Sequence, residues 1–269
     1  MDTVRSEELS AQPGAALPRP PHVEFLGLPF SLLPLHQVVR LIVRRCGPPY
    51  RYIVTPNAYH VAIVHDDPDR LLPVYRGAWL SLCDSRIVRT LARLDRLSLP
   101  LVAGSDLVAA LLDTLDREAA DGNARQLLIV GPPLDAAAPL RAAYPNLKFD
   151  VMPAAAGLAG DAALRRELAA ACLNRPWDIL VLCVGCPAQE MIAATLAELG
   201  RTSGIALCAG AAIDFLIGVQ RRAPAWMRRL QLEWAYRLAL DPARLWRRYL
   251  VESPKIFRIF MTTRSSRRR

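Results

Sequence analysis

The chain has 269 residues, and its 52% hydrophobic content is enough for a sizeable core and too high for a disordered protein. Its formal net charge of +9 is unevenly placed, because residues 221–269 hold 14 basic and three acidic residues and so carry +11, whereas the rest carries −2. No uninterrupted apolar run reaches the roughly 18 residues of a membrane-spanning helix, so none is predicted.

The two ends of the chain differ in composition from its body. Residues 1–21 are polar and rich in Pro and Ala, without the basic start and apolar stretch of a signal peptide, which predicts a disordered leader on a cytoplasmic protein. The six cysteines are scattered, mostly within apolar runs, which favours reduced thiols over disulfides. We expect a catalytic core at 22–220, a helical appendage at 221–257 and a basic tail at 258–269, disordered from Arg264 onward.

Short β-rich runs alternate with helical patterns in the body. The predicted strands are Tyr50–Thr55, Trp79–Cys83, Gln126–Val130, Lys148–Met152, Asp178–Val184 and Gly204–Cys208. The predicted helices are Ala58–His65, Arg86–Leu94, Asp106–Asp116, Leu134–Ala143, Asp161–Leu173 and Ala188–Leu199. This alternation predicts an α/β fold with a Rossmann-like, mostly parallel sheet.

Polar residues follow four of these strands. In order they are Thr55 with Asn57, then Asp84, then Gly131, and finally Gly185 with Gln189 and Glu190. Parallel strands end at one edge of a sheet, where ligands bind in such folds. The sequence therefore predicts a site built from these segments.

Several of these residues have two interpretations. Asp84 is either a carboxylate tuned to abstract a proton or the N-cap of the next helix. Gly104, Ser105 and Asp106 either cap a helix or form a loop close to a ligand. Gln189 and Glu190 begin a helix whose N–H groups suit a phosphate or a sugar hydroxyl, or they complete a capping box.

Other motifs weigh against common cofactor and metal sites. Gly131 lacks the glycine pattern of dinucleotide-binding and ATP-hydrolysing proteins. Asp67 and Asp69 offer an Asp-x-Asp metal motif, but the intervening Pro68 favours an acidic helix start. The four histidines show no ligand spacing, and the single Cys-x-x-Cys at 183–186 has no second ligand pair nearby. We expect no metal and no cofactor.

The C-terminal region is basic and interrupted by prolines. Residues 243–251 place Leu245, Trp246 and Leu250 among arginines, a pattern that can bind a membrane interface or anionic phosphates. The charge also allows a nucleic-acid-binding protein, although nucleic acid would not explain the polar residues at the strand ends.

An ordered series of motifs resembles the WecG/TagA/CpsF glycosyltransferase family from about Val23 to Phe257. The motifs are Thr55-Pro-Asn57, Asp84, Gly104-Ser-Asp106-Leu, Gly185-x-Pro-x-Gln189-Glu190, Gly210-Ala-Ala-x-Asp214-Phe, Arg222-Ala-Pro-x-Trp226 and Leu232-Glu-Trp234-x-Tyr-Arg237-Leu. The resemblance implies an inverting, metal-independent enzyme that moves a sugar from a UDP-sugar to a polyprenyl-diphosphate-linked saccharide. It places the protein at the inner leaflet of the plasma membrane and fixes no oligomeric state. An inactive scaffold of the same machinery is the alternative.

The resemblance also assigns roles by position. Asp84 would be the general base, Thr55 and Asn57 would border the acceptor and the reacting sugar, and Gln189 would contact the donor. Asp214 would lie near the nucleotide, and Arg237, Arg244 and Arg247 would neutralise diphosphate.

Two departures from the family pattern bear on the sugar. Ser85 follows Asp84 where the family usually has glycine, and Ala103 replaces a threonine. The first favours the exopolysaccharide branch, and the donor stays open among glucose, N-acetylmannosamine and its uronic acid.

Overall fold

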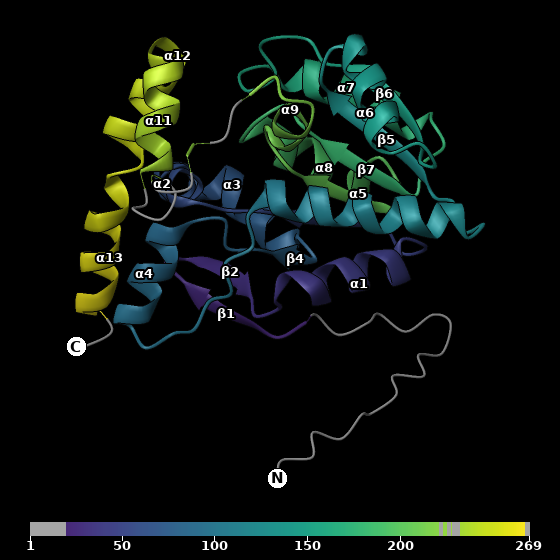
Figure 1. Ribbon diagram of the computed structural model, residues 1–269. Coiled ribbons are helices and arrows are strands. Elements are labelled where there is room, and N and C mark those ends of the chain that lie inside the picture. The colour runs from purple at the N-terminus through teal and green to yellow at the C-terminus, as the bar shows by residue number, and fades with distance from the viewer. Residues whose placement is uncertain (1–19, 221–222, 225–226, 228–231, 267–269) are drawn as a thin grey trace.

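A computed structural model of the protein describes residues 20–220, 223–224, 227 and 232–266. Its centre is a six-stranded parallel sheet with the strand order β4-β3-β8-β7-β5-β6 (Figure 1). The strands are β3 (Arg51–Val54), β4 (Leu80–Ser81), β5 (Gln126–Gly131), β6 (Lys148–Pro153), β7 (Ile179–Leu182) and β8 (Ile205–Cys208). A separate antiparallel hairpin joins β1 (His22–Phe25) to β2 (Leu28–Ser31).

Helices cover both faces of the sheet. One face is covered by α1 (Leu35–Arg45), α5 (Gly104–Ala120), α6 (Ala137–Ala143) and α9 (Ala212–Leu216). The other face is covered by α2 (Ala58–Asp66), α3 (Pro68–Gly77), α4 (Arg86–Leu94), α7 (Ala162–Leu173), α8 (Ala188–Glu198) and α13 (Lys255–Ser266). The remaining helical segments are η1 (Leu134–Ala136), α11 (Glu233–Leu240), α12 (Pro242–Trp246) and the π-helical η2 (Arg247–Glu252).

The arrangement of one sheet between two helical layers follows from the strand sequences. Successive side chains of a strand point to opposite faces. In β7, Ile179 and Val181 join one core cluster, and Leu180 and Leu182 join the other. All four are fully buried, as a central strand covered on both sides requires.

The predicted α/β fold is confirmed, with local differences. All six expected strands form, although β4 shortens to two residues with a bridge between Cys83 and Leu101 beyond it. The hairpin and α1 were not predicted, and of α3 only the start was. Each strand of the hairpin has only four residues, and β2 does not alternate because all four of its residues are buried. α3 begins at Pro68 with Asp69 in its first turn, which confirms the helix-start interpretation of the acidic motif.

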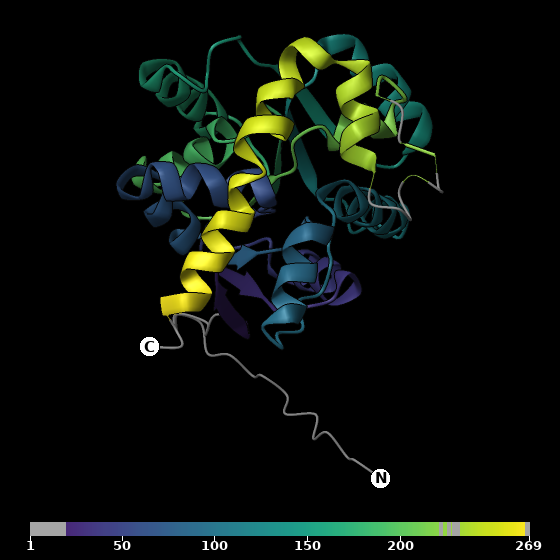
Figure 2. The ribbon, with the colours of Figure 1, turned by 90° about the vertical axis from the view of Figure 1, so that its left-hand side faces the viewer.

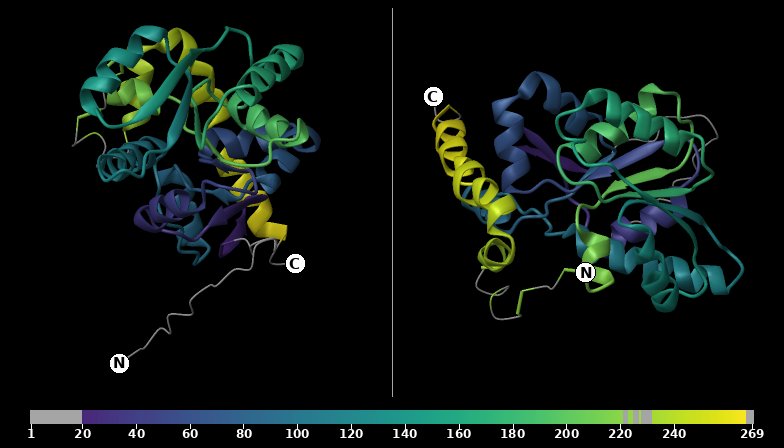
Figure 3. Two further views of the ribbon diagram at one scale, coloured as in Figure 1. Left: turned by 90° about the vertical axis from the view of Figure 1, so that its right-hand side faces the viewer. Right: turned by 90° about the horizontal axis from the view of Figure 1, so that it is seen from above.

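The C-terminal helices form a layer along one side of the sheet domain, seen across the front in Figure 2 and from above in Figure 3. α13 contributes Ile256, Ile259 and Phe260 to the core beside α2, and Phe260 packs edge-on against Phe25 with ring centroids 6.3 Å apart. No described helix is long and apolar enough to cross a membrane.

The expected disorder of the tail is wrong for residues 264–266, because α13 runs to Ser266. Two ion pairs hold the helix: Lys255 Nζ lies 2.6 Å from Asp66 Oδ2, and Arg264 Nε lies 3.4 Å from Asp95 Oδ1. The expected boundary between appendage and tail, at 257/258, falls inside this helix. Residues 1–19 of the expected leader, and Arg222 and Trp226 of the Arg-Ala-Pro-x-Trp motif, lie outside the described residues.

Candidate functional site

The structure brings several predicted site residues together at the carboxyl edge of the sheet. Thr55 follows β3, is buried, and donates a hydrogen bond from Oγ1 to the carbonyl of Cys208 at the end of β8, at 3.0 Å. Asp84 follows β4, and its backbone N–H donates to the carbonyl of Pro56 at 3.0 Å. Gly104 begins α5 beside both side chains. The structure therefore brings together Thr55 and Asp84, from two of the four predicted strand-end segments, and places the start of α5 beside them.

The carboxyl group of Asp84 has an unusual environment. Burial raises its pKa to about 7. The hydrogen bond from the Gly104 N–H acts in the opposite direction, because it stabilises the charged form. Glu233 of α11 raises this pKa further, whereas Arg237 of the same helix lowers it. A carboxyl group with this pKa can take up and release a proton near neutral pH.

The alternative interpretation of Asp84 as a helix cap is wrong. Ser85 is the N-cap of α4, and its Oγ accepts a hydrogen bond from the Val88 N–H at 3.2 Å. No side-chain capping bond is present at the starts of α5 and α8 either, so the capping interpretations of Ser105, Asp106, Gln189 and Glu190 are also wrong. These residues lie in the first turns of their helices.

Gly104 is packed so closely that a side chain would disturb the site. A Cβ atom here would lie 3.3 Å from Thr55 Oγ1, 3.6 Å from Asp84 Oδ2 and 3.7 Å from the Ala209 carbonyl. The glycine therefore allows the helix start to approach Asp84.

We expect Gly104→Ala to lower kcat/KM of the reaction proposed below by about tenfold, because an atomic shift of a few tenths of an ångström misplaces a reacting group. Thermal unfolding should change little, since alanine favours the helix. The matched control is Gly47→Ala, where a Cβ atom would meet no other atom within 4 Å. Equal activities for the two variants would contradict a close fit at Gly104.

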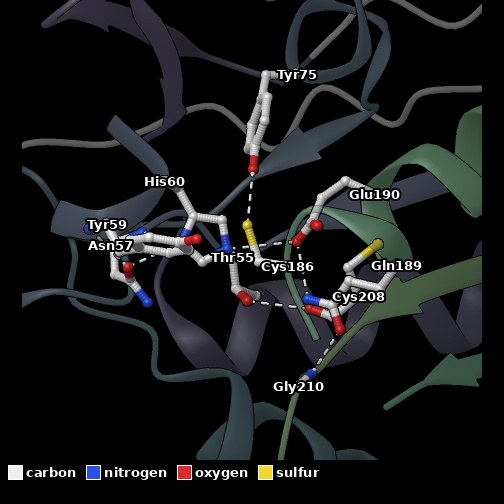
Figure 4. A network of polar contacts seen from close by, with 10 residues as sticks. All are labelled: Thr55, Asn57, Tyr59, His60, Tyr75, Cys186, Gln189, Glu190, Cys208 and Gly210. Carbon is white, nitrogen blue, oxygen red and sulfur yellow. Dashed lines mark hydrogen bonds and ion pairs between the residues drawn. The ribbon is translucent and has the colours of Figure 1, made fainter. Parts of the chain in front are cut away.

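Gln189 and Glu190 are both buried at the start of α8 (Figure 4). Gln189 Oε1 accepts a hydrogen bond from the Gly210 N–H at 2.9 Å, and its Nε2 donates to Glu190 Oε1 at 2.8 Å. Two of the groups expected to face a donor are thus engaged within the protein. That Gln189 or Glu190 contacts a substrate stays a prediction.

His60 lies next to Glu190, although the two are 130 positions apart in the sequence (Figure 4). His60 Nε2 lies 3.4 Å from Glu190 Oε1, and His60 Nδ1 lies 2.8 Å from Asn57 Oδ1. Burial alone would raise the pKa of Glu190, but the contacts with His60 and Gln189 hold it below its usual value. The carboxylate is therefore ionised at neutral pH.

Among the described residues, one group has the composition of a metal site. The ligand atoms of His60, Cys186 and Glu190 all lie within 4.8 Å of one another. One nitrogen, one sulfur and one oxygen donor would suit zinc. The histidine spacing gave no signal of this cluster, because its members come from two distant segments.

The remaining strand-end residues differ in their surroundings. Gly131 has a φ of +121°, and a Cβ atom there would lie 2.7 Å from the carbonyl oxygen of Cys183, so close packing explains this glycine. Gly185 has a φ of +83° with no atom within 4 Å of its Cβ position. Asp214, on α9, accepts a hydrogen bond from Gln220 Nε2 at 3.0 Å.

The three predicted arginines do not share one position. Arg237 lies against α9, with its guanidinium carbon 5.3 Å from the Phe215 ring centroid. Arg247 has an exposed side chain whose Nε lies 3.5 Å from Glu252 Oε1. The side chain of Arg244 lies outside the described part of the structure.

Arg248 also contacts the core, which the sequence interpretation missed. Its guanidinium carbon lies 4.7 Å from the ring centroid of Tyr59, two residues after Asn57. Its Nε is buried without a hydrogen-bond partner among the described residues. Three arginines stand within five positions here, and the sequence alone did not show which of them faces inward.

The comparisons with known proteins agree with this architecture. A model of the Glycosyl transferase WecG/TagA/CpsF family matches residues 23–269. A curated relative, the N-acetylglucosaminyldiphosphoundecaprenol N-acetyl-beta-D-mannosaminyltransferase of Bacillus subtilis (strain 168), is 35% identical over 108 residues. That match spans 40% of this chain and 39% of the relative. Because the family model covers nearly the whole chain, including every strand-end segment of the site, the protein belongs to the WecG/TagA/CpsF family of glycosyltransferases.

Proposed function

We propose that the protein transfers a sugar from a UDP-sugar to a polyprenyl-diphosphate-linked saccharide, with inversion at the sugar carbon. The observation that carries this proposal is Asp84, a carboxyl group with a pKa of about 7 at the ligand-binding edge of the sheet. Family membership supports the reaction class, and the relative's name supports a diphosphoundecaprenol-linked acceptor.

In the proposed reaction Asp84 removes the proton from the acceptor hydroxyl. The freed oxygen forms a bond to the anomeric carbon of the donor sugar while the bond from that carbon to the UDP oxygen breaks. UDP leaves with the electron pair, and a single displacement inverts the configuration. Thr55 and Asn57 would border the reacting sugar, and Asp214 would lie near the nucleotide.

Arginine side chains would stabilise the departing diphosphate without a metal ion. Guanidinium groups bind phosphate oxygens through paired, charge-assisted hydrogen bonds. Arg237 suits this role because its charge acts on Asp84 and lowers the pKa of that carboxyl group, and Arg248 suits it because it contacts Tyr59 of α2. The exposed Arg247 better suits contact with an anionic surface.

The C-terminal helices supply a surface for the membrane that holds the acceptor. Five large apolar side chains on the described parts of these segments are each more than half exposed, namely Leu240, Trp246, Leu250, Phe257 and Met261. Exposed apolar residues beside basic ones are typical of helices that lie in a membrane interface. We infer a peripheral position at the inner leaflet, in exopolysaccharide or other cell-surface polysaccharide assembly.

We expect the double variant Phe257→Ser/Met261→Ser to bind anionic vesicles about tenfold more weakly than the wild type, because two apolar side chains no longer enter the bilayer. Vesicle sedimentation at two salt concentrations would measure this. Leu134→Ser, which removes an exposed leucine from the far side of the sheet, is the matched control. Duplex DNA that binds more tightly than the vesicles would favour the nucleic-acid alternative.

A transfer assay tests the proposed function directly. The protein is incubated with UDP-glucose, UDP-N-acetylmannosamine or its uronic acid and with polyprenyl-diphosphate-linked N-acetylglucosamine, and UDP release is measured with and without a chelator. We expect release that depends on both substrates and persists with the chelator. Acceptor-independent release, or none with any donor, would contradict the function, and loss of activity with the chelator would contradict the metal-free mechanism.

A further inference from the structure

The turn that follows β8 is fixed by the ends of both neighbouring strands. β8 lies between β3 and β7 in the sheet. Thr55, after β3, donates to the Cys208 carbonyl, and Gln189, after β7, accepts from the Gly210 N–H. Between these two bonds, the Ala209 carbonyl faces Gly104, which in turn contacts Asp84. The position of this turn therefore bears directly on the geometry around Asp84.

The amide of Gln189 can adopt only one orientation. The Gly210 N–H is a donor, so the oxygen of Gln189 must face it, and the NH₂ group must then face Glu190. An ionised Glu190 only accepts hydrogen bonds, which enforces the same orientation. His60 Nε2 lies 3.4 Å from Glu190 Oε1 as a charge contact outside hydrogen-bond geometry, and His60 Nδ1 lies 2.8 Å from Asn57 Oδ1 and 3.2 Å from the Asn57 N–H.

Keeping this carboxylate in the interior is energetically costly. Glu190 is fully buried, and its Oε2 has no hydrogen-bond partner within the described structure. An apolar residue of similar size would fill the same space without that cost. What Glu190 adds is a directional acceptor for Gln189 and a negative charge beside His60, and such buried polar networks select one arrangement of the groups that they join.

We propose that Glu190 and His60 are positioning residues of the sugar transfer: they orient Gln189, which holds the turn Cys208–Gly210 beside Asp84. This inference rests on the proposed function for its catalytic consequence. Its structural part, the control of the Gly210 amide by Glu190, stands apart from any reaction and can be measured without substrate.

The structural part is tested by NMR on protein labelled with ¹⁵N-glycine. The chain has 14 glycines, and the spectrum of Gly210→Ala identifies the Gly210 signal. We expect Glu190→Met to shift this signal and to speed its hydrogen exchange about tenfold, because the acceptor that faces it is no longer held in place. His60→Asn should act in the same direction but less strongly. Gln189→Met removes the acceptor itself and shows the full effect.

Glu190→Gln separates hydrogen bonding from charge. A glutamine oxygen at the Oε1 position can still accept from Gln189, so the Gly210 signal and most of the activity should be kept. If Glu190→Gln instead matched Glu190→Met, the charge rather than the acceptor would matter and the proposal would be overturned. An unchanged Gly210 signal in both Glu190→Met and His60→Asn would overturn it as well.

The catalytic part is tested by combining variants. If Glu190 acts through Gln189, then kcat should fall about tenfold in Glu190→Met, and Gln189→Met/Glu190→Met should be no worse than Gln189→Met alone. If the losses in kcat of the two single variants multiplied in the double variant, the proposal would be overturned. It would also be overturned if the purified protein held stoichiometric zinc that Glu190→Met abolished.

Leu115→Ala, in the core of α5, controls for general destabilisation and should leave the Gly210 signal in place. A wild type that transfers no sugar would remove the function but leave the NMR result standing.

Discussion

Replacing Asp84 with asparagine is expected to lower kcat by about 10²–10⁴-fold, because the amide cannot accept the proton of the acceptor hydroxyl. Asparagine has nearly the same shape and can still accept the hydrogen bond from the Gly104 N–H. The fold and the affinity for UDP should therefore be kept. Steady-state kinetics and UDP calorimetry would measure the two effects, with the exposed Asp135→Asn as control. Wild-type turnover in Asp84→Asn would remove Asp84 as the base.

The pH dependence provides a second check on the same residue. The base must be ionised, so kcat/KM should rise with pH through the value of about 7 that burial gives this carboxyl group. In Asp84→Asn the residual activity should lose this rising limb. A limb that persists unchanged would belong to another group.

Asp84 should also make the folded protein less stable as the pH rises. Its pKa is raised from 3.8 to about 7, so between these values the folded state holds a proton that the unfolded state releases. The free energy of unfolding therefore falls as the pH passes through this window. Thermal unfolding should show Asp84→Asn to be more stable than the wild type at pH 8, and nearly equal to it at the low end of the window. The opposite sign would show that the carboxylate is stabilised rather than strained in its site.

The sequence predicted the parts of the fold that rest on continuous apolar runs. β5, β7 and β8 are such runs, and β3 and β4 run parallel to them, which places Thr55 and Asp84 at the same edge of the sheet. The hairpin β1–β2 was missed because β1 alternates over only four residues and β2 is buried throughout. The location of the site was therefore predictable, because it depends on the order and direction of the strands and not on side-chain packing.

The contacts within the site could not be predicted in the same way. The pairing of His60 with Glu190 depends on how α2 and α8 pack, and no local spacing encodes it. Arg247 and Arg248 are adjacent on η2 and point in different directions. How η2 is rotated about its axis therefore decides which of the two contacts Tyr59, and the sequence does not encode this rotation. The sequence also led us to treat the C-terminal region as an appendage, whereas α13 buries Ile256 and Phe260 in the main core. Removing residues from 221 onward should therefore destabilise the protein.

Two charged residues of α11 should shift the pH dependence in opposite directions. Glu233 and Arg237 are four positions apart, and both act on Asp84: the first raises its pKa and the second lowers it. Arg237→Gln should move the rising limb of kcat/KM to higher pH, and Glu233→Gln should move it to lower pH. Opposite shifts from one helix would show that α11 faces Asp84 in solution.

Arg237→Gln should also lower kcat by about 10²–10³-fold, because a guanidinium that meets the departing diphosphate stabilises the transition state. This loss is measured at a pH above the rising limbs of both the wild type and the variant, where Asp84 is ionised in each. Arg247→Gln removes the same charge from an exposed position and serves as the matched comparison. Both the pH of its rising limb and its kcat at high pH should change less than those of Arg237→Gln. If Arg237→Gln changed only the limb, Arg237 would serve to tune the base. If it changed only the plateau, the guanidinium would act on the leaving group without governing Asp84. The proposed mechanism requires both effects, since the same side chain must face the base and the diphosphate across one reacting sugar.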